Sequence, residues 1–318
     1  MGQPNVGKSV VFGALTGTYV TVSNYPGTTV EITRGRARFG DDLWEVVDTP
    51  GTHNLVPMSE DEAVTRDLLV SEPHDAIVQV GDAKNLARTL LLTLQIAELG
   101  VPFCLDLNML DEARARGTRI DFERLAGELP GVRVNASTAT ENEGLDVVRE
   151  YLAKHEGEAG GGVRAPLTCA PRFPDDVEAA IADVEASLEG DLPVSKRAIA
   201  TMLLGGERGI GGQLHVKVGE KARTVAAERA QRLARAHGVP VFALLSRLRL
   251  TRAQAIVRAV QSRDRSGEKR AHEGHVSWAK AAGFAGLSAL VAAATYDGAL
   301  ALTGTTATAD PLDDYGFF

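Results

Sequence analysis

The stretch GQPNVGKS, Gly2 to Ser9, decides the fold, because it fits the Gly-x4-Gly-Lys-Ser pattern of a phosphate-binding loop. The glycines let main-chain N–H groups approach phosphate oxygens, and the helix that begins at Lys8 offers the positive end of its dipole. Lys8 is expected to reach the β- and γ-phosphates, and the Ser9 hydroxyl to bind Mg²⁺. The loop residues expected to contact the nucleotide are Gly2, Asn5, Val6, Gly7, Lys8, Ser9 and Val10.

Two motifs that end apolar, strand-like runs belong with this loop. In DTPG, residues 48–51, the Asp48 carboxylate can hold Mg²⁺ through water and the Gly51 N–H can contact a γ-phosphate. In NMLD, residues 108–111, Asp111 can accept hydrogen bonds from the N1–H and the 2-amino group of guanine. Adenine lacks this pair of donors, so the motif selects guanine. Its expected contact residues are Asn108, Met109 and Asp111.

Two weaker motifs complete the set. NYPGTTVE, residues 24–31, lies where GTPases carry the switch threonine that binds Mg²⁺. STATENEGL, residues 137–145, occupies the place of the fifth motif, with Ala139 as the expected main-chain donor to guanine O6. The order of the motifs predicts a GTP-binding domain. Thr52 stands where many GTPases carry a water-orienting Gln, so intrinsic hydrolysis is expected to be slow.

The remaining sequence pattern predicts an α/β fold with a second, all-helical part. Apolar runs at 30–39, 43–48, 76–82, 102–108 and 132–137 alternate with amphipathic stretches, which indicates a P-loop domain with a mostly parallel sheet over 1–155. A glycine-rich linker is expected at 156–170. Apolar residues at helical spacing then predict a small all-α domain over 171–265.

The amino-acid composition bears on which classes of function are compatible with the chain. The net charge of −8 and the pI near 5.5 argue against a general nucleic-acid binder. Residues 221–270, however, hold 13 Lys and Arg against 3 Asp and Glu. The two cysteines, Cys104 and Cys169, have no metal-ligand spacing and suit a reducing compartment.

The two ends of the chain predict further structural features. A P-loop hangs from a buried strand, and Met1 alone precedes Gly2, so we expect a truncated or misplaced start and reduced stability. Near the other end, 279–302 is a candidate for a single membrane helix, followed by a tail at 303–318. Basic residues before it and acidic residues after it agree with an amino end facing the cytoplasm. A buried, Ala-rich helix of a soluble domain explains the same run almost equally well.

Several stretches together resemble the cytoplasmic amino-terminal region of the FeoB family, the bacterial ferrous-iron transporters. They are PGTTVE, VVDTPGTHNL, SEDEAVTRDLL, DAKNLARTLLLTLQIAELGVP and LNMLDEARARGTRID, which cover most of residues 2–155. DDVEAAI and KRAIATMLL are similar to the helical domain of the family. The resemblance implies a GTP-binding and GTP-hydrolysing regulatory module, linked to a membrane region that carries Fe²⁺. It also implies a place at the cytoplasmic face of the bacterial inner membrane.

The resemblance assigns roles by position. Lys8, Thr29 and Gly51 would take part in hydrolysis, and Ser9, Thr29 and Asp48 would bind Mg²⁺, with Thr28 as the alternative to Thr29. Asn5 matches an asparagine that helps hold K⁺ in potassium-activated members. SNY, residues 23–25, departs from the usual Gly-Asn-Trp, and Thr138-Ala139 replaces the commoner Ser-Ala.

The expected partners are GTP or GDP and a membrane domain, with no nucleic acid and with homo-oligomers as an open question. Two other functions remain open. One is a soluble, Era-like GTPase switch in ribosome or RNA maturation, for which the basic 221–270 segment is the best support. The other is a decayed gene product that binds little.

Overall fold

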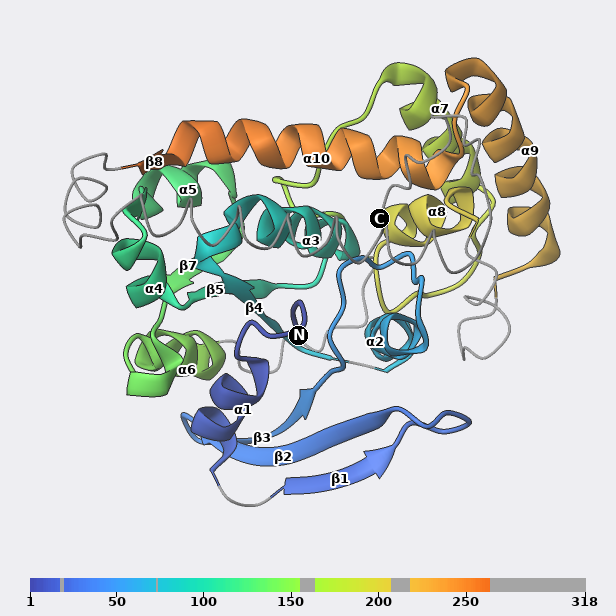
Figure 1. Ribbon diagram of the computed structural model, residues 1–318. Coiled ribbons are helices and arrows are strands. Elements are labelled where there is room, and N and C mark those ends of the chain that lie inside the picture. The colour runs from blue at the N-terminus through green and yellow to red at the C-terminus, as the bar shows by residue number, and fades with distance from the viewer. Residues whose placement is uncertain (18–19, 73, 155–163, 207–217, 264–318) are drawn as a thin grey trace, which may run out of the picture. The chain divides into compact units, whose positions relative to one another are not determined.

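The computed structural model describes residues 1–17, 20–72, 74–154, 164–206 and 218–263 (Figure 1). All of them belong to one compact unit, Met1–Asp264. Within these ranges no helix is both long and apolar enough to cross a membrane. The expected membrane helix at 279–302 and the tail at 303–318 lie outside the described residues, as does most of the expected linker.

Two three-stranded sheets form the α/β part. One is parallel, with the order β4-β5-β7, and contains β4 (Ile77–Asp82), β5 (Phe103–Asn108) and β7 (Arg133–Ala136). The other is antiparallel, with the order β1-β2-β3, and contains β1 (Val20–Asn24), β2 (Glu31–Phe39) and β3 (Asp42–Asp48). Strands β2, β3, β4, β5 and β7 fall on the five predicted apolar runs, so the α/β prediction with a parallel sheet is confirmed.

The parallel sheet is covered on both faces, as βαβ connections require. Figure 1 shows α3 (Leu86–Leu99) on one face, and α1 (Lys8–Thr16) and α6 (Leu145–Lys154) on the other. Alternate side chains of β5 therefore enter different clusters: Leu105 packs with the residues of α3, and Cys104 packs with Val148 of α6. The remaining helices of this part are α2 (Glu60–Ser71), α4 (Leu110–Ala115) and α5 (Phe122–Glu128), with short 3₁₀ turns at Ala83–Asn85 and Ala139–Glu141.

The helical part consists of α7 (Asp175–Glu185), α8 (Lys196–Leu204), α9 (Glu220–His237) and α10 (Val241–Val260). Buried apolar residues of these helices share one continuous core with the α3 side of the parallel sheet. The long helix α10 packs on α3 and α5 and ends in β8 (Gln261–Arg263), which pairs antiparallel with β6 (Thr118–Ile120). The predicted helical part is present, and its last helix is built into the α/β part rather than tethered to it.

Candidate nucleotide-binding site

The loop before α1 has the backbone shape that a phosphate cradle needs. Gly7 lies in the left-handed region with a φ of 87°, and a Cβ atom there would sit 2.4 Å from the Asn108 amide nitrogen. Asn5 is also left-handed, with a φ of 61°. Helix α1 starts directly afterwards, and the N–H groups of Val10 and Val11 both bond to the Gly7 carbonyl oxygen. The loop therefore turns its early N–H groups toward the space in front of the helix.

Main-chain bonds hold the two ends of this loop. Gly2 pairs in parallel with Val80 of β4, and a Cβ atom on Gly2 would lie 2.2 Å from the Val80 carbonyl oxygen. The Gly2 carbonyl oxygen accepts a 3.0 Å bond from Thr52 N–H, which ties the loop to the DTPG turn. A Cβ atom on Gly51 would meet Pro4 at 2.8 Å. The DTPG turn and the loop thus approach more closely than larger residues permit.

Lys8 and Ser9 place a cation and a hydroxyl at the mouth of the loop. The Lys8 ammonium donates to the Gln3 carbonyl oxygen at 3.1 Å, so it closes over the loop. Burial lowers the pKa of Lys8, and the nearby Asp48 carboxylate opposes that shift. The Ser9 hydroxyl donates to Asp48 Oδ2 at 2.9 Å. A hydroxyl and a carboxylate oxygen side by side form the hard-oxygen donor set that suits Mg²⁺, so the residues present fit that ion.

The base side of the site is organised around Asn108, at the carboxyl end of β5. Its amide nitrogen donates to the Val6 carbonyl oxygen at 3.0 Å. Its Oδ1 accepts the Ala139 N–H at 2.9 Å. Only 4% of Asn108 is exposed, so both bonds are protected from water. One side chain therefore joins the phosphate loop, the NMLD motif and the fifth motif.

The neighbours of Asn108 complete that edge. Met109 adopts the left-handed conformation with a φ of 60° and caps α4, which places Asp111 in the exposed first turn of that helix. The Asp111 carboxylate is thus open to an incoming base. Thr138 is buried, and its N–H bonds to the Glu143 carbonyl oxygen at 3.1 Å. The Ala139 N–H, expected to face guanine O6, donates to Asn108 in this structure.

Thr29 is the expected site residue that the structure leaves apart from the rest. It is exposed, in a turn closed by the Tyr25 N–H to Val30 carbonyl bond of 2.8 Å. The register of β2 against β3 sets Thr33, not Thr29, opposite Asp48. Thr29 lies in the turn before β2, which begins at Glu31, and precedes Thr33 by four residues. Among the described residues no hydrogen bond joins Thr29 to Ser9 or Asp48, whereas Thr28 donates to the Tyr25 carbonyl oxygen.

Thr52 cannot orient water in the way that a long polar side chain does. It is fully buried, and its hydroxyl donates to the Asn54 carbonyl oxygen at 2.7 Å. The next residue, His53, is exposed, and its main-chain N–H bonds to Glu62 at 2.9 Å. The segment after DTPG is therefore pinned by the carboxylate of Glu62, which also accepts Met58 N–H.

Sequence reasoning missed the polar side chains beneath Asn108. Asp106, Asn135 and Ser137 are buried on the α6 side of the sheet, and Asn135 and Ser137 each donate a hydrogen bond to Asp106. The signal was present, because Asp106 interrupts the otherwise apolar run PFCLDL. Gln3 was also missed: it is 4% exposed, and its amide donates to the Arg88 carbonyl oxygen at 2.7 Å.

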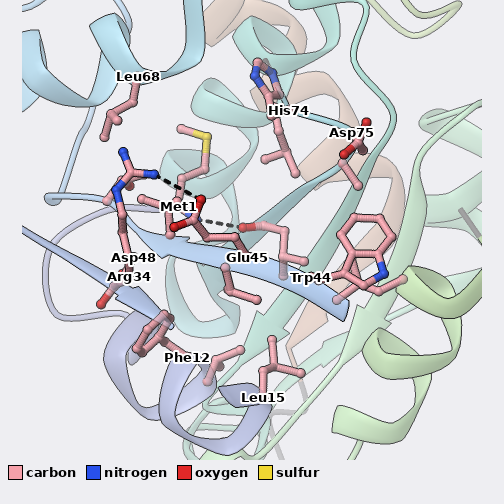
Figure 2. Close-up of a pocket in the computed structure, with 18 of the residues that line it drawn as sticks. Met1, Phe12, Leu15, Arg34, Trp44, Glu45, Asp48, Leu68, His74 and Asp75 are labelled. Atoms are coloured by element: carbon pink, nitrogen blue, oxygen red, sulfur yellow. Dashed lines mark hydrogen bonds and ion pairs between the residues drawn. The ribbon is translucent and has the colours of Figure 1, made fainter. Parts of the chain in front are cut away.

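A cavity of about 550 Å³ adjoins the site (Figure 2). Apolar side chains of α1, β3 and β4 line much of it, including Phe12, Trp44 and Val78, and Lys8 and Asp48 lie on its boundary. Met1 enters it and pairs with β4 through its nitrogen to Val78 O and its carbonyl oxygen to Val80 N, both at 2.8 Å. The cavity separates β3 from β4, which belong to different sheets.

Comparison with known proteins gives matches along most of the described chain. The family model described as ferrous iron transport protein B matches residues 1–152, and the FeoB cytosolic helical domain matches residues 173–262. The Fe(2+) transporter FeoB of Staphylococcus aureus (strain COL) is 40% identical over 129 residues, which are 41% of this chain and 19% of that protein. The Legionella pneumophila (strain Paris) transporter is 39% identical over 156 residues, 48% of this chain and 21% of that protein. The chain thus spans about a fifth of the length of these curated relatives.

Solved structures agree with the sequence matches. A GDP-bound variant of the S. thermophilus FeoB G-domain has a TM-score of 0.71 and 30% identity, and the match covers 82% of this chain and 97% of that one. The cytosolic domain of L. pneumophila FeoB gives a TM-score of 0.70 at 28% identity, with the same coverage. These matches confirm the resemblance noted in the sequence, and the chain belongs to the FeoB family, with that family's P-loop GTPase fold followed by its cytosolic helical domain.

Proposed function

We propose that this chain binds GTP and GDP and hydrolyses GTP, as the regulatory module of a ferrous-iron transport protein. The observation that carries the proposal is the convergence at Asn108. This side chain bonds the phosphate loop through Val6 and the fifth motif through Ala139, close to the Ser9–Asp48 pair. The base function therefore lies at the carboxyl end of the parallel strand β5, where ligands bind in open α/β sheets, and the phosphate loop and the carboxyl end of β3 bring the phosphate and metal functions to it.

Each residue has a proposed task in binding. Lys8 exchanges the Gln3 carbonyl oxygen for the β- and γ-phosphate oxygens, since its bond to Gln3 spans the mouth of the loop. Ser9 and Asp48 hold Mg²⁺, and Thr29 joins them after its segment moves. Asp111 reads the guanine N1–H and 2-amino group, and Asn5 helps hold K⁺. The remaining expected contacts are main-chain or packing contacts from Gly2, Val6, Gly7, Val10, Met109, Thr138 and Ala139.

Hydrolysis is the attack of water on the γ-phosphorus, with GDP as the leaving group. Mg²⁺, when bound, neutralises charge on the β- and γ-phosphate oxygens. Lys8 and the loop N–H groups stabilise the charge that develops on the leaving oxygen, and the Gly51 N–H contacts the γ-phosphate. Because the Thr52 hydroxyl is buried and bonded to Asn54, this chain supplies no water-orienting group at that position, and slow intrinsic turnover follows.

The wider role rests on the relatives. They are Fe(2+) transporters about five times longer than the matched region, so the natural partner proposed for this module is a membrane domain that carries Fe²⁺. The module would then act at the cytoplasmic face of the inner membrane. Fe²⁺ is the cargo of that partner and needs no ligands here. In the described part of the chain no cluster of His, Cys, Asp and Glu could hold a metal ion.

The experiment that tests the proposal is Lys8→Ala, with Lys154→Ala as the matched control. Lys154 is an exposed lysine of α6 whose ammonium pairs with Glu150. Loss of a charge-assisted bond to phosphate predicts that GTP affinity falls about 10- to 100-fold in Lys8→Ala. GTP affinity stays unchanged in Lys154→Ala. Calorimetric titration with Mg²⁺ measures the affinities and phosphate release measures turnover. Equal GTP binding by the two variants would refute the site.

A further inference from the structure

Asp106 is a carboxylate buried in the middle of a parallel sheet. It is 0% exposed and lies on β5 between Cys104 and Asn108, which share its face of the sheet. Burial raises the pKa of Asp106, while hydrogen bonds from Ser137 and Asn135 lower it. A lone carboxylate in such a place is costly unless its oxygens are bonded. Its position, one step below Asn108 on the same face, puts it directly under the candidate base site.

Two neutral side chains satisfy this carboxylate. Asn135, its cross-strand partner on β7, donates to Oδ1 at 2.7 Å, and the Ser137 hydroxyl donates to Oδ2 at 2.8 Å. Among the described residues Asp106 forms no ion pair with lysine or arginine. Because an ionised carboxylate only accepts hydrogen bonds, it fixes the direction of both donors. We call Asp106, Asn135 and Ser137 the buried triad.

The buried triad holds both ends of the loop that carries the fifth motif. The Asn135 amide also donates to the Gly144 carbonyl oxygen at 3.0 Å, at the far end of the 137–144 segment. At the near end, the Ser137 carbonyl oxygen accepts Leu110 N–H at 3.3 Å, which joins the loop to the NMLD motif. A Cβ atom on Gly144 would lie 2.2 Å from the Ala136 carbonyl oxygen, so the loop closes tightly. Ala139 lies inside this closed segment.

We propose that Asp106 is a positioning residue for the guanine site: through Asn135 and Ser137 it holds the 137–144 loop, and with it Ala139, against Asn108 at the edge of the sheet where the base binds. The inference rests on the proposed function. Core stability alone does not require the triad, because buried polar groups replaced by apolar ones of similar volume often cost little. The triad instead fixes the orientation of the loop, because hydrogen bonds among three side chains allow one geometry, whereas apolar contacts allow several.

The test uses three nucleotide-site probes that separate base from phosphate recognition: GDP, IDP and tripolyphosphate. IDP keeps O6 and N7 and lacks the 2-amino group that Asp111 reads. Asp106→Ala removes the acceptor that Asn135 and Ser137 share and leaves them only their bonds to Gly144 O and, at 3.4 Å, to Asn108 Oδ1, so GDP and IDP affinities should both fall about 10-fold. Tripolyphosphate affinity should be unchanged because the phosphate loop is intact. Ser137→Ala should show the same pattern, and adding it to Asp106→Ala should cost little more.

Two control variants separate the loss of the hydrogen bonds from a general loss of stability. Asp106→Asn can still bond both partners and should recover GDP affinity to within about 3-fold of the wild type. Cys104→Ala removes a buried side chain from the same face of β5, one step farther from the site, and should lower stability with GDP affinity unchanged. Wild-type GDP affinity in Asp106→Ala, or equal losses for GDP and tripolyphosphate, would overturn the inference alone. A wild-type chain that binds neither GDP nor IDP would overturn the proposed function, and this inference with it.

Discussion

At the scale of single residues, Asp111 carries the choice of base. Its carboxylate lies exposed in the first turn of α4, next to the left-handed Met109 that sets the direction of the helix. Asp111→Asn exchanges an acceptor for a donor where the 2-amino group of guanine would approach. We expect the preference for GDP over IDP to fall toward one, as measured by competition binding. The neighbouring acid gives the control: Glu112→Gln removes the negative charge that pairs with Lys84 and should keep the preference for GDP over IDP.

Asp106 predicts a pH dependence of stability. Its pKa is raised above the ordinary value near 3.8, chiefly by burial, so at pH values between the unfolded-state and folded-state pKa the folded chain holds a proton that the unfolded chain releases. Stability therefore falls as pH rises from about 3.8 through the folded-state pKa. Cys104, the titratable neighbour on its face, stays neutral there, because burial raises its pKa to about 12.

The measurement is the urea midpoint of the wild type and of Asp106→Asn between pH 4 and 7. Other carboxylates titrate in both proteins, so the informative quantity is the difference between the two. We expect Asp106→Asn to gain stability relative to the wild type as pH rises. A difference that stays constant with pH would show that Asp106 titrates normally.

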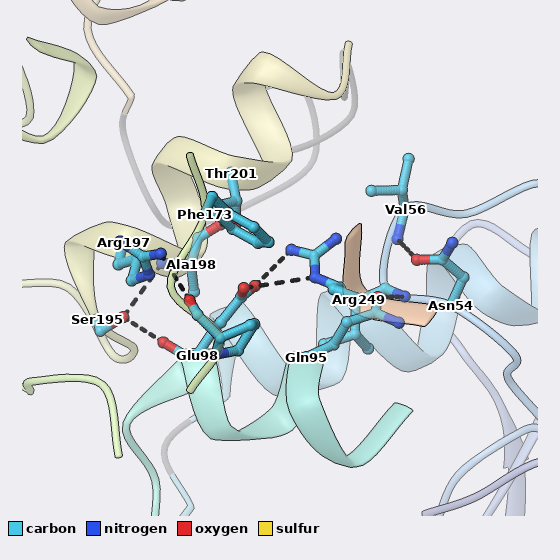
Figure 3. Close-up of polar contacts among 12 residues, drawn as sticks. Asn54, Val56, Gln95, Glu98, Phe173, Ser195, Arg197, Ala198, Thr201 and Arg249 are labelled. Atoms are coloured by element: carbon cyan, nitrogen blue, oxygen red, sulfur yellow. Dashed lines mark hydrogen bonds and ion pairs between the residues drawn. The ribbon is translucent and has the colours of Figure 1, made fainter. Parts of the chain in front are cut away.

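At the scale of elements, α3 joins the turn after DTPG to the helical part (Figure 3). Gln95 Oε1 accepts Leu55 N–H at 2.9 Å on one side. One turn later, Glu98 pairs with Arg249 of α10, and both are at most 3% exposed. The Glu98 carbonyl oxygen also accepts the Ser195 hydroxyl, just before α8. Polar groups on one helix thus connect the turn after DTPG with two helices of the helical part.

The Glu98–Arg249 pair should behave as a buried ion pair. Arg249→Met leaves the Glu98 carboxylate buried and uncompensated, so we expect about 3–5 kcal/mol of lost stability. Replacing both residues, by Arg249→Met with Glu98→Gln, should recover much of that loss.

A surface pair on the same helix gives the matched control. Arg252 is exposed and pairs with Glu128 at 3.0 Å, so Arg252→Ala should cost less than about 1 kcal/mol. Urea unfolding of the four proteins measures the differences. Equal losses in Arg249→Met and Arg252→Ala would contradict the assignment.

The strands show how much of the secondary structure can be predicted from the sequence. The apolar runs predicted β2 to β5 and β7. Strands β4 and β5 are buried and parallel and read as continuous hydrophobic stretches, whereas β2 alternates between buried and exposed residues along much of its length. Strand β1 was not predicted, since all its residues are exposed and its shape depends on pairing with β2. The β6–β8 pair joins three-residue segments about 140 positions apart, which local pattern does not encode.

The residues of the candidate site likewise fall into those that the sequence predicted and those that it did not. Spacing predicted Lys8, Ser9, Asp48 and Asn108, and the structure brings these residues together. The sequence did not identify the charged residues that become buried only when the chain folds. Glu98, Arg249 and Asp106 read as ordinary charges on helices and strands until packing encloses them. The motif PGTTVE identified Thr29 as a candidate Mg²⁺ ligand. Its position relative to Asp48 depends on how β2 pairs with β3, and the local sequence does not determine that register.

At the scale of the whole molecule, two family models cover residues 1–152 and 173–262 and distinguish between the two GTPase functions that the sequence left open. They favour the ferrous-iron transport family over a GTPase of ribosome or RNA maturation. The basic residues of 221–263, which gave that alternative its support, lie largely on α9 and α10, and some of them pair within the chain, as Arg229 does with Asp183. Charge on these helices therefore does not require an RNA partner.

The central claim is guanine-selective nucleotide binding at the edge where Asn108 joins the phosphate loop. Titration calorimetry of this chain with GDP, GTP and ATP, each with Mg²⁺ and in K⁺ and Na⁺ buffers, tests it most directly. We predict one site per chain for GDP and GTP, and ATP binding weaker by at least about 100-fold, because adenine lacks the donors that Asp111 accepts. Equal affinities for GTP and ATP, or binding of none of the three, would contradict it.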